Sequence, residues 1–275
     1  MATASTRRER SLPRPSVFAI ARYLTRPQAQ TFAFSVATMA VLSFFPFMIV
    51  LIMFIRRGIE SKAMYDVVVQ FLRDHIPIGQ DYVIRALNGI VTARKQAQLG
   101  SLLVLLVAAR GVFMPLEVSL NHIWGFEKGR SWVRNQMVGA ALVLGCGVLA
   151  LMSVGFTAAN QYLLGQAMGP RNPALRLGAF VVMKLVATVV TITIFFLIYW
   201  LVPSGPVSAA RVFPAAVLFG LLWELAKYGY IFLLPHIAFQ EVYGPFSISV
   251  ALLMWGYISG LVLLAGAYFS AAPQS

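Results

Sequence analysis

The sequence predicts an all-α polytopic membrane protein, and three observations lead to this fold class. Hydrophobic residues make up 59% of the 275-residue chain and charged residues only 11%, whereas a soluble domain carries about 25% charged residues. The mean hydropathy is +0.78. The apolar residues form continuous runs, unlike the short alternating segments of a membrane barrel. These runs therefore indicate helices.

Six apolar runs are long enough to cross a bilayer, since a spanning helix needs about 20 predominantly apolar residues. They comprise residues 32–55, 99–120, 136–158, 177–202, 212–234 and 246–271. The first run is too long, and starts too far along the chain, for the apolar core of a cleavable secretory signal. We expect a six-helix transmembrane domain over 32–271, between a basic segment (1–31) and a short C-terminus (272–275).

Basic residues near the span ends predict the orientation, because cytoplasmic loops carry an excess of Lys and Arg. The segment 1–31 contains six arginines against the single acid Glu9. We therefore expect both termini in the cytoplasm of a bacterial inner membrane. With six spans, the basic loop 121–135 is also cytoplasmic, and the segment 56–98 lies on the external side of the membrane.

The external segment 56–98 shows a helical pattern. Its apolar residues from Met64 to Leu72 follow the helical spacing, Pro77 and Gly79 interrupt the pattern, and it resumes from Val83 to Val91. Two short amphipathic helices are predicted. Three placements remain open: on the membrane surface, over the mouth of the bundle, or packed as a hairpin on the protein itself.

Charged residues inside the spans, together with one asparagine at the end of the second span, are the candidate functional residues. Each costs about 2.5 to 3.5 kcal/mol at the centre of a membrane helix, so such groups face a bundle interior, a partner or an aqueous cavity. The ligand-binding or transport candidates are Arg110, Glu117, Asn121, Lys184, Glu224 and Lys227. Their helical stripes predict a partly polar interior. The alternative is a set of structural ion pairs that hold the helices together.

The net charge of +13 does not indicate nucleic-acid binding, because the basic residues are scattered and no RNA-binding module is present. Anionic lipid headgroups explain the excess better. The three histidines and the single Cys146 show no metal-ligand spacing. We also find no nucleophile elbow or phosphate-binding glycine loop. The sequence predicts no enzyme, no metal and no cofactor.

Three motifs resemble the YihY/BrkB family of bacterial inner-membrane proteins. They are AVLSFFP with Ser43 and Pro46, PLEVSLNHIWG with Trp124, and the C-terminal set LWELAKYG, VYGPF and LMWGY with Tyr243, Gly244 and Trp255. The resemblance covers nearly the whole chain. One departure is Tyr268, which follows Gly266 and Ala267 where the family commonly has Glu.

The resemblance implies a six-helix inner-membrane bundle linked to envelope integrity and virulence, with no settled molecular function. Some members carry a ribonuclease name, but no metal site here supports that activity. It also implies that Pro46 and Gly244 shape the backbone, and that Asn121 and Glu224 are candidates for ligand contact. The best functional hypothesis is transport or flipping of an amphipathic, anionic, lipid-like molecule through a polar cavity. The alternative is a non-transporting envelope scaffold. Substrate, energy source and oligomeric state are not predicted.

Overall fold

The structure, a computed structural model, describes residues 16–75, 84–85, 88–89, 100, 114–126, 132–167, 173–237 and 239–271. These residues form helices and connecting turns, with no β-strand among them. Five helices are long and apolar enough to cross a membrane. They are α2 (Pro27–Phe54), α6 (Trp132–Ala167), α7 (Pro173–Leu201), α8 (Ala209–Leu233) and α10 (Ser247–Ala271). The predicted all-α polytopic fold class is confirmed.

Five of the six predicted spans correspond to these helices. The remaining one, 99–120, lies mostly outside the described residues, including Arg110, while its described part belongs to a helical segment over 114–124. The helices α2, α6 and α7 begin four or five residues before the apolar runs that predicted them, because a helix continues into polar flanking residues that do not raise the hydropathy.

Shorter helices flank the spans. α1 (Val17–Leu24) precedes α2 within the segment predicted only as a basic extension, and α3 (Lys62–His75) follows α2 through a π-helical turn, Ile55–Ile59. α9 (Phe239–Tyr243) lies between two 3₁₀ turns, Leu234–His236 and Gly244–Phe246, in the connection from α8 to α10.

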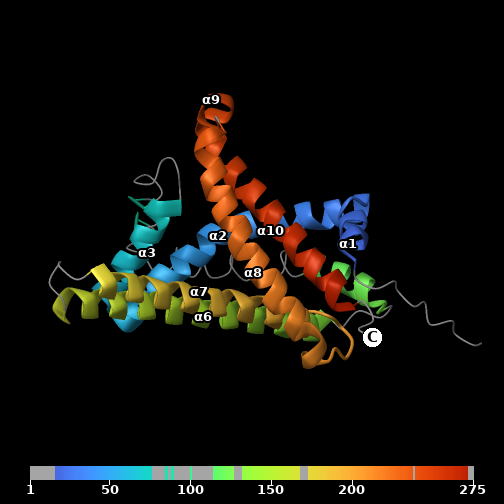
Figure 1. Cartoon of the computed structure of the whole chain (residues 1–275), viewed down its shortest axis with the longest axis horizontal. Coiled ribbons are helices and arrows are strands. Elements are labelled where there is room, and N and C mark those ends of the chain that lie inside the picture. Colours follow the sequence, from blue (N-terminus) through green and yellow to red (C-terminus); the bar gives the residue numbers. More distant parts are fainter. Residues whose placement is uncertain are drawn as a thin grey trace, which may run out of the picture.

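The long helices form two groups (Figure 1). α6 and α7 lie side by side, and α7 also packs on α8. α10 packs against α2 on one side and α8 on the other, while α1 packs on α10. α3 lies at one end of the molecule and α1 at the opposite end (Figure 1). The bundle therefore has two distinct ends.

Small residues bring α2 and α10 close together. A Cβ atom added to Gly256 would lie 3.1 Å from the Cα of Ala37, and one added to Gly260 would lie 3.0 Å from the backbone oxygen of Ala33. A side chain at either position would therefore crowd the backbone of α2. Gly256 and Gly260, a small-xxx-small pair, thus serve helix packing within the chain.

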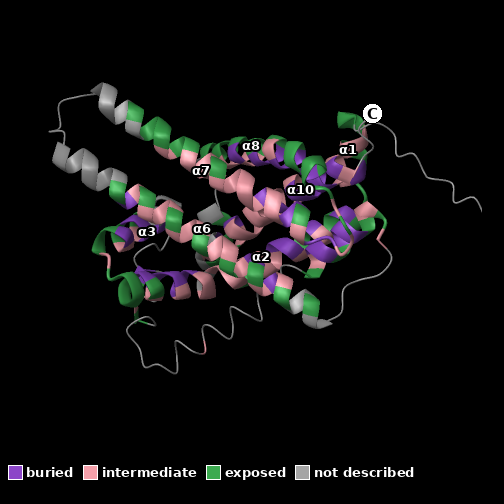
Figure 2. Cartoon of the chain, turned by 90° about the horizontal axis from the view of Figure 1, so that it is seen from below, coloured by how far each residue is buried: buried purple, intermediate pink, exposed green. Residues whose placement is uncertain are grey.

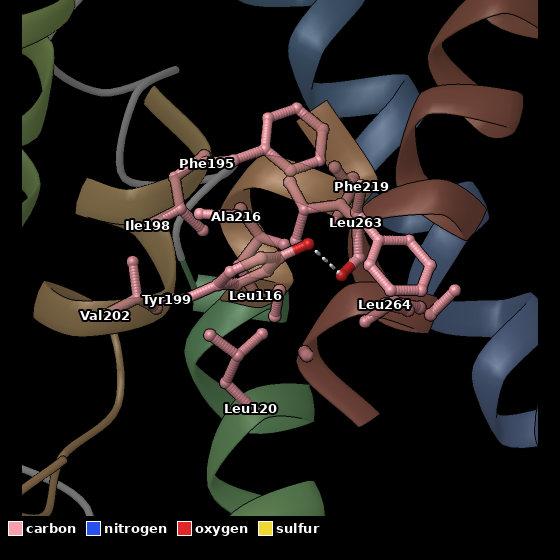
Figure 3. Packing of buried hydrophobic residues seen from close by; sticks show 14 of the residues in the cluster. Leu116, Leu120, Phe195, Ile198, Tyr199, Val202, Ala216, Phe219, Leu263 and Leu264 are labelled. Atoms are coloured by element: carbon pink, nitrogen blue, oxygen red, sulfur yellow. Dashed lines mark hydrogen bonds between the residues drawn. The ribbon is translucent and has the colours of Figure 1, made fainter. Parts of the chain in front are cut away.

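The main core surrounds Tyr199 of α7 (Figure 3). This side chain is fully buried, and its hydroxyl donates a hydrogen bond of 3.0 Å to the backbone oxygen of Leu263 in α10. Leu116 and Leu120 of the 114–124 segment are also in this core. The segment therefore packs inside the bundle.

The helix α3 packs on its own protein, which supports the third placement predicted for the external segment. Its buried side chains, including Val68 and Leu72, join a second apolar cluster with Ile52 of α2 and Ala158 of α6. The turn before α3 contains Glu60 in the left-handed conformation, with φ at 57°. The hydroxyl of Tyr65 donates to Asn88 at 2.9 Å, which ties α3 to the following segment.

The outer faces of α6 and α7 are apolar yet uncovered. Only 6% of the spanning stretch in α6 and 17% of that in α7 is buried, against 39% in α10. Leu144, Met152 and Leu185 are among the exposed side chains. Figure 2 shows exposed and intermediate residues along much of both helices, with buried residues where α10 packs on α2 and on α8. In water such faces are unfavourable, whereas in a bilayer they contact lipid.

Candidate functional site

Two of the candidate residues form an ion pair on α8. The ammonium of Lys227 lies 2.6 Å from Oε2 of Glu224, one turn earlier in the same helix. Thr191 of α7 donates a hydrogen bond of 2.7 Å to Oε1 of the same carboxylate. Both oxygens of Glu224 are therefore engaged within the protein, as predicted for a structural pair.

Lys184 of α7 lies in a different environment. Its ammonium donates to the hydroxyl of Tyr228 on α8 and lies 4.6 Å from the centre of the Tyr228 ring and 5.5 Å from that of Phe180. Among the described residues no carboxylate forms an ion pair with it. The Lys184 side chain is exposed, and its ammonium contacts two aromatic faces and one hydroxyl.

A cavity of about 640 Å³ adjoins Lys184. Its walls come from α2, α3, α6 and α7, and most are apolar, such as Phe47, Val67, Val154 and Val190. The polar residues in the lining are Gln70, Ser153, Thr157 and Lys184. We call it the main cavity. It lies on the α3 side of the bundle, where the C-terminal part of α2 meets the N-terminal part of α7.

The main cavity is more apolar than the sequence predicted. The expected polar interior is largely absent because polar side chains satisfy one another or their own backbone. Thr157 and Thr188 donate to carbonyls one turn earlier in their own helices. Glu224 and Lys227 pair with each other on α8. Neither residue lines the main cavity or the second, smaller cavity described below. Of the predicted ligand-binding residues in described positions, Lys184 alone lines the main cavity.

A smaller cavity, of about 270 Å³, adjoins the main one. α2, α7, α8 and α10 form its walls, which include Ala40, Ile198 and Trp255. Phe44 of α2 and Ile194 of α7 line both cavities. We call it the inner cavity.

Glu117 and Asn121 meet at the other end of the bundle, through a residue that the sequence analysis missed. Ser204, in the turn between α7 and α8, donates from its hydroxyl to Oε1 of Glu117 at 2.8 Å. Asn121 holds the same serine twice, donating to its hydroxyl at 2.8 Å and accepting from its backbone N–H at 2.7 Å. Both Glu117 and Asn121 are buried. The Pro203-Ser204-Gly205-Pro206 turn was the available signal, but nothing local links it to Asn121.

The family-motif residues shape helices and their ends. Pro46 lies within α2, and Ser43 one turn before it donates to the Met39 carbonyl at 2.7 Å. Gly244, just after Tyr243, has a φ of +49°, a conformation that glycine adopts without strain.

The two motif tryptophans lie at different places. The ring of Trp255 lies 5.3 Å from that of Trp223 and 5.2 Å from that of Tyr230, all between α8 and α10. Trp124 lies in the 114–124 segment, 5.8 Å below the guanidinium of Arg211. Both contribute to packing between elements.

Within the described residues, no group of three His, Cys, Asp or Glu side chains is placed to hold a metal ion. The absence of catalytic and cofactor chemistry stays a prediction.

The long helices and their lipid-facing surfaces define the class: a multi-pass α-helical membrane protein. The chain belongs to the family described as Virulence factor BrkB, whose family model matches residues 20–275. This confirms the resemblance in the motifs.

Curated relatives carry the description "UPF0761 membrane protein". The chain is 26% identical to one from Pseudoalteromonas atlantica over 263 residues, covering 93% of this chain and 85% of the relative. It is 32% identical to one from Chlorobium chlorochromatii and 33% identical to one from Chromobacterium violaceum, over 62% and 60% of this chain. In both, the match covers only 39% of the relative's length. No solved structure matches the chain significantly.

Proposed function

We propose that this protein binds an amphipathic, anionic, lipid-like molecule of the cell envelope and moves it between leaflets of a bacterial inner membrane. The observation that carries the proposal is the main cavity, a partly open, largely apolar space of about 640 Å³ with Lys184 among its lining residues. Ligand sites commonly fall within about 300 to 1,000 Å³ and combine apolar walls with a few polar groups. An anionic headgroup with an apolar tail matches this combination.

The depth of Lys184 supports contact with a headgroup. It lies four residues inside the apolar stretch Phe180–Leu201, or about 6 Å at the rise of an α-helix. From that depth a lysine can extend its ammonium toward the membrane interface while its methylene groups stay in apolar surroundings. A phosphate or carboxylate could therefore reach it without leaving the interface.

The orientation belongs to the proposal. Both termini are cytoplasmic, as the N-terminal arginines predict, which places α3 and the main cavity toward the outer leaflet. The protein acts without catalysis, metal or cofactor in this scheme.

A transfer assay tests the proposal. The full chain is reconstituted in vesicles of zwitterionic lipid with a trace of a fluorescent long-chain alkyl phosphate, and the rate at which that probe becomes accessible to an impermeant quencher is measured. We expect the wild type to accelerate transfer and Lys184→Met to lose most of the effect. Lys62→Met, which removes an exposed cation on α3, is the matched control and should behave as the wild type.

A rate equal to that of protein-free vesicles would overturn the transport proposal. The envelope scaffold is the second candidate, and the engaged Glu224–Lys227 pair favours it. A scaffold predicts no transfer and no bound lipid in the purified protein. Equal loss of rate in Lys184→Met and Lys62→Met would show a general charge effect rather than a site at the main cavity.

A further inference from the structure

The two cavities follow one another along the same pair of helices. On α2, the main cavity is lined by residues from Phe44 to Leu51, and the inner cavity by residues from Val36 to Phe44. On α7, the main cavity extends from Phe180 to Ile194 and the inner cavity from Ile194 to Ile198. The cavities are therefore arranged end to end, since on both helices the order runs from the α3 side inward.

The length of this arrangement can be estimated from α7. Lys184 to Ile194, at the end of the main cavity, covers ten residues, or about 15 Å. Continuing to Ile198 adds four residues and extends the distance to about 21 Å. The hydrocarbon core of a bilayer is about 30 Å thick, so one leaflet is about 15 Å deep. The two cavities together reach beyond one leaflet.

The boundary between the cavities consists of side chains. Phe44 and Ile194 each line both compartments, and they come from opposite walls, α2 and α7. Phe44 and Ile194 are only partly buried, and side chains that reach the surface change rotamer rapidly without a change of backbone. A ligand chain could thus pass between these two side chains if they moved apart.

We infer that the main and inner cavities form one chain-binding track, and that the site selects an anionic amphiphile with a single apolar chain longer than the depth of one leaflet. The headgroup binds at Lys184, and the chain end passes Phe44 and Ile194 into the inner cavity. A linear arrangement suits one long alkyl or polyprenyl chain, whereas two parallel chains of an ordinary phospholipid would need cavities side by side. This inference rests on the proposed function and specifies its substrate class.

The inner cavity supports the assignment by its chemistry. Its lining includes Val36, Ala40, Leu252 and Leu263, and it contains no charged residue. The hydroxyl of Ser259 in this lining accepts a hydrogen bond of 2.9 Å from the indole nitrogen of Trp223, so these two polar groups bond to each other. The compartment is thus suited to a hydrocarbon chain end and not to a second headgroup.

Chain-length selectivity tests the inference. The full chain, purified in a nonionic detergent, is mixed with equal amounts of decyl, tetradecyl and octadecyl phosphate, and the bound forms are counted by native mass spectrometry. The variant Ala40→Phe fills the inner cavity, and Ala150→Phe, in the wall of the main cavity, is the matched control. Using one detergent throughout cancels the preference of long chains for micelles.

We expect the ratio of bound octadecyl to bound decyl phosphate to fall about tenfold or more in Ala40→Phe, because each buried methylene contributes about fourfold to binding. Decyl phosphate should bind Ala40→Phe as it binds the wild type, and Ala150→Phe should weaken all three ligands. Ile194→Ala, which enlarges the passage, should raise the octadecyl ratio. Melting temperatures of the variants show whether each is folded, and Ile194→Ala tests the track if Ala40→Phe does not fold.

The outcomes separate this inference from the proposed function. If no alkyl phosphate binds the wild type, the headgroup site at Lys184 is wrong and both proposals fall. If decyl phosphate binds but the octadecyl ratio is unchanged in both Ala40→Phe and Ile194→Ala, the track is wrong while the main-cavity site stands. Binding of a two-chain phosphatidic acid to the wild type as strong as that of octadecyl phosphate would also overturn the single-chain assignment.

Discussion

Tyr23 of α1 and Tyr268 of α10 stack face to face, with ring centres 4.7 Å apart and planes within 9° of parallel. Tyr268 is the position at which the motif resemblance departs from its usual pattern, and here its ring packs α10 against α1. The contact also brings the beginning of α2 and the end of α10 to one face of the bundle. If the chain crossed the membrane five times, the beginning of α2 and the end of α10 would lie on opposite sides. Their position at one face therefore indicates an even number of membrane crossings.

The first prediction concerns topology. Reporter fusions at Ser5 and at Gln274 should both report a cytoplasmic location, and a fusion at Gly79 should report an external one. The Tyr23–Tyr268 stack places the two ends on one face, and the N-terminal arginines assign that face to the cytoplasm. Opposite locations for Ser5 and Gln274 would contradict six spans.

The second prediction concerns the stack itself. Tyr268→Glu should lower the free energy of unfolding by about 0.5 to 1.5 kcal/mol, the range for an aromatic pair, while Tyr268→Phe should stay near the wild type. The measurement is a detergent unfolding titration. A loss in Tyr268→Phe equal to that in Tyr268→Glu would rule out ring stacking as the cause.

The third prediction follows from the environment of Tyr23. Burial, opposed by Arg26 and reinforced by Tyr268, raises the pKa of its hydroxyl to about 12. The unfolded value is about 10, so the neutral form contributes stability that is complete below pH 10 and lost as the pH rises toward 12. The free energy of unfolding should therefore fall across this interval in the wild type. The fall should be smaller in Tyr23→Phe, and an identical pH profile would refute the assignment.

The fourth prediction addresses Glu224 and Lys227. Glu224→Gln should destabilise the protein by about 3 kcal/mol, because it leaves a partly buried cation without its partner. The double change with Lys227→Met should recover most of that loss if the pair is structural. Melting temperature measures stability, and the vesicle assay measures transfer. Recovery of stability without recovery of transfer would instead assign Glu224 a direct role in transport.

The fifth prediction concerns Ser204. Ser204→Ala removes the hydroxyl that joins Glu117 to Asn121, and should lower the free energy of unfolding by about 1 to 3 kcal/mol because buried polar groups lose their partner. Ser208, exposed and without a side-chain capping bond in the same connection, provides the control. Ser208→Ala should stay within about 0.5 kcal/mol of the wild type. Equal effects of the two changes would show that the network adds no stability.

By itself, the sequence determined the fold class, the positions of five long helices and the apolar face of α3. These properties are local. A long apolar run requires a helix once it lies in a membrane, since every backbone polar group must bond within the segment. The spacing of Met64, Val67, Val68 and Leu72 likewise marks one helical face. The motifs around Pro46, Trp124 and Gly244 also indicated the family, which the family match to residues 20–275 confirms.

Only the tertiary structure decided which polar groups meet and where cavities form. Apart from a few polar side chains, helices such as α6 and α8 are apolar on all sides, so their hydrophobic pattern does not show which face turns inward. The bonds from Asn121 to Ser204 join residues 83 positions apart, and the bond from Thr191 to Glu224 joins residues 33 positions apart. The sequence showed that Glu117, Lys184 and Glu224 had to be accommodated. Helix packing determined that Glu117 binds a serine, that Thr191 of α7 reaches Glu224 of α8, and that Lys184 lines an apolar cavity.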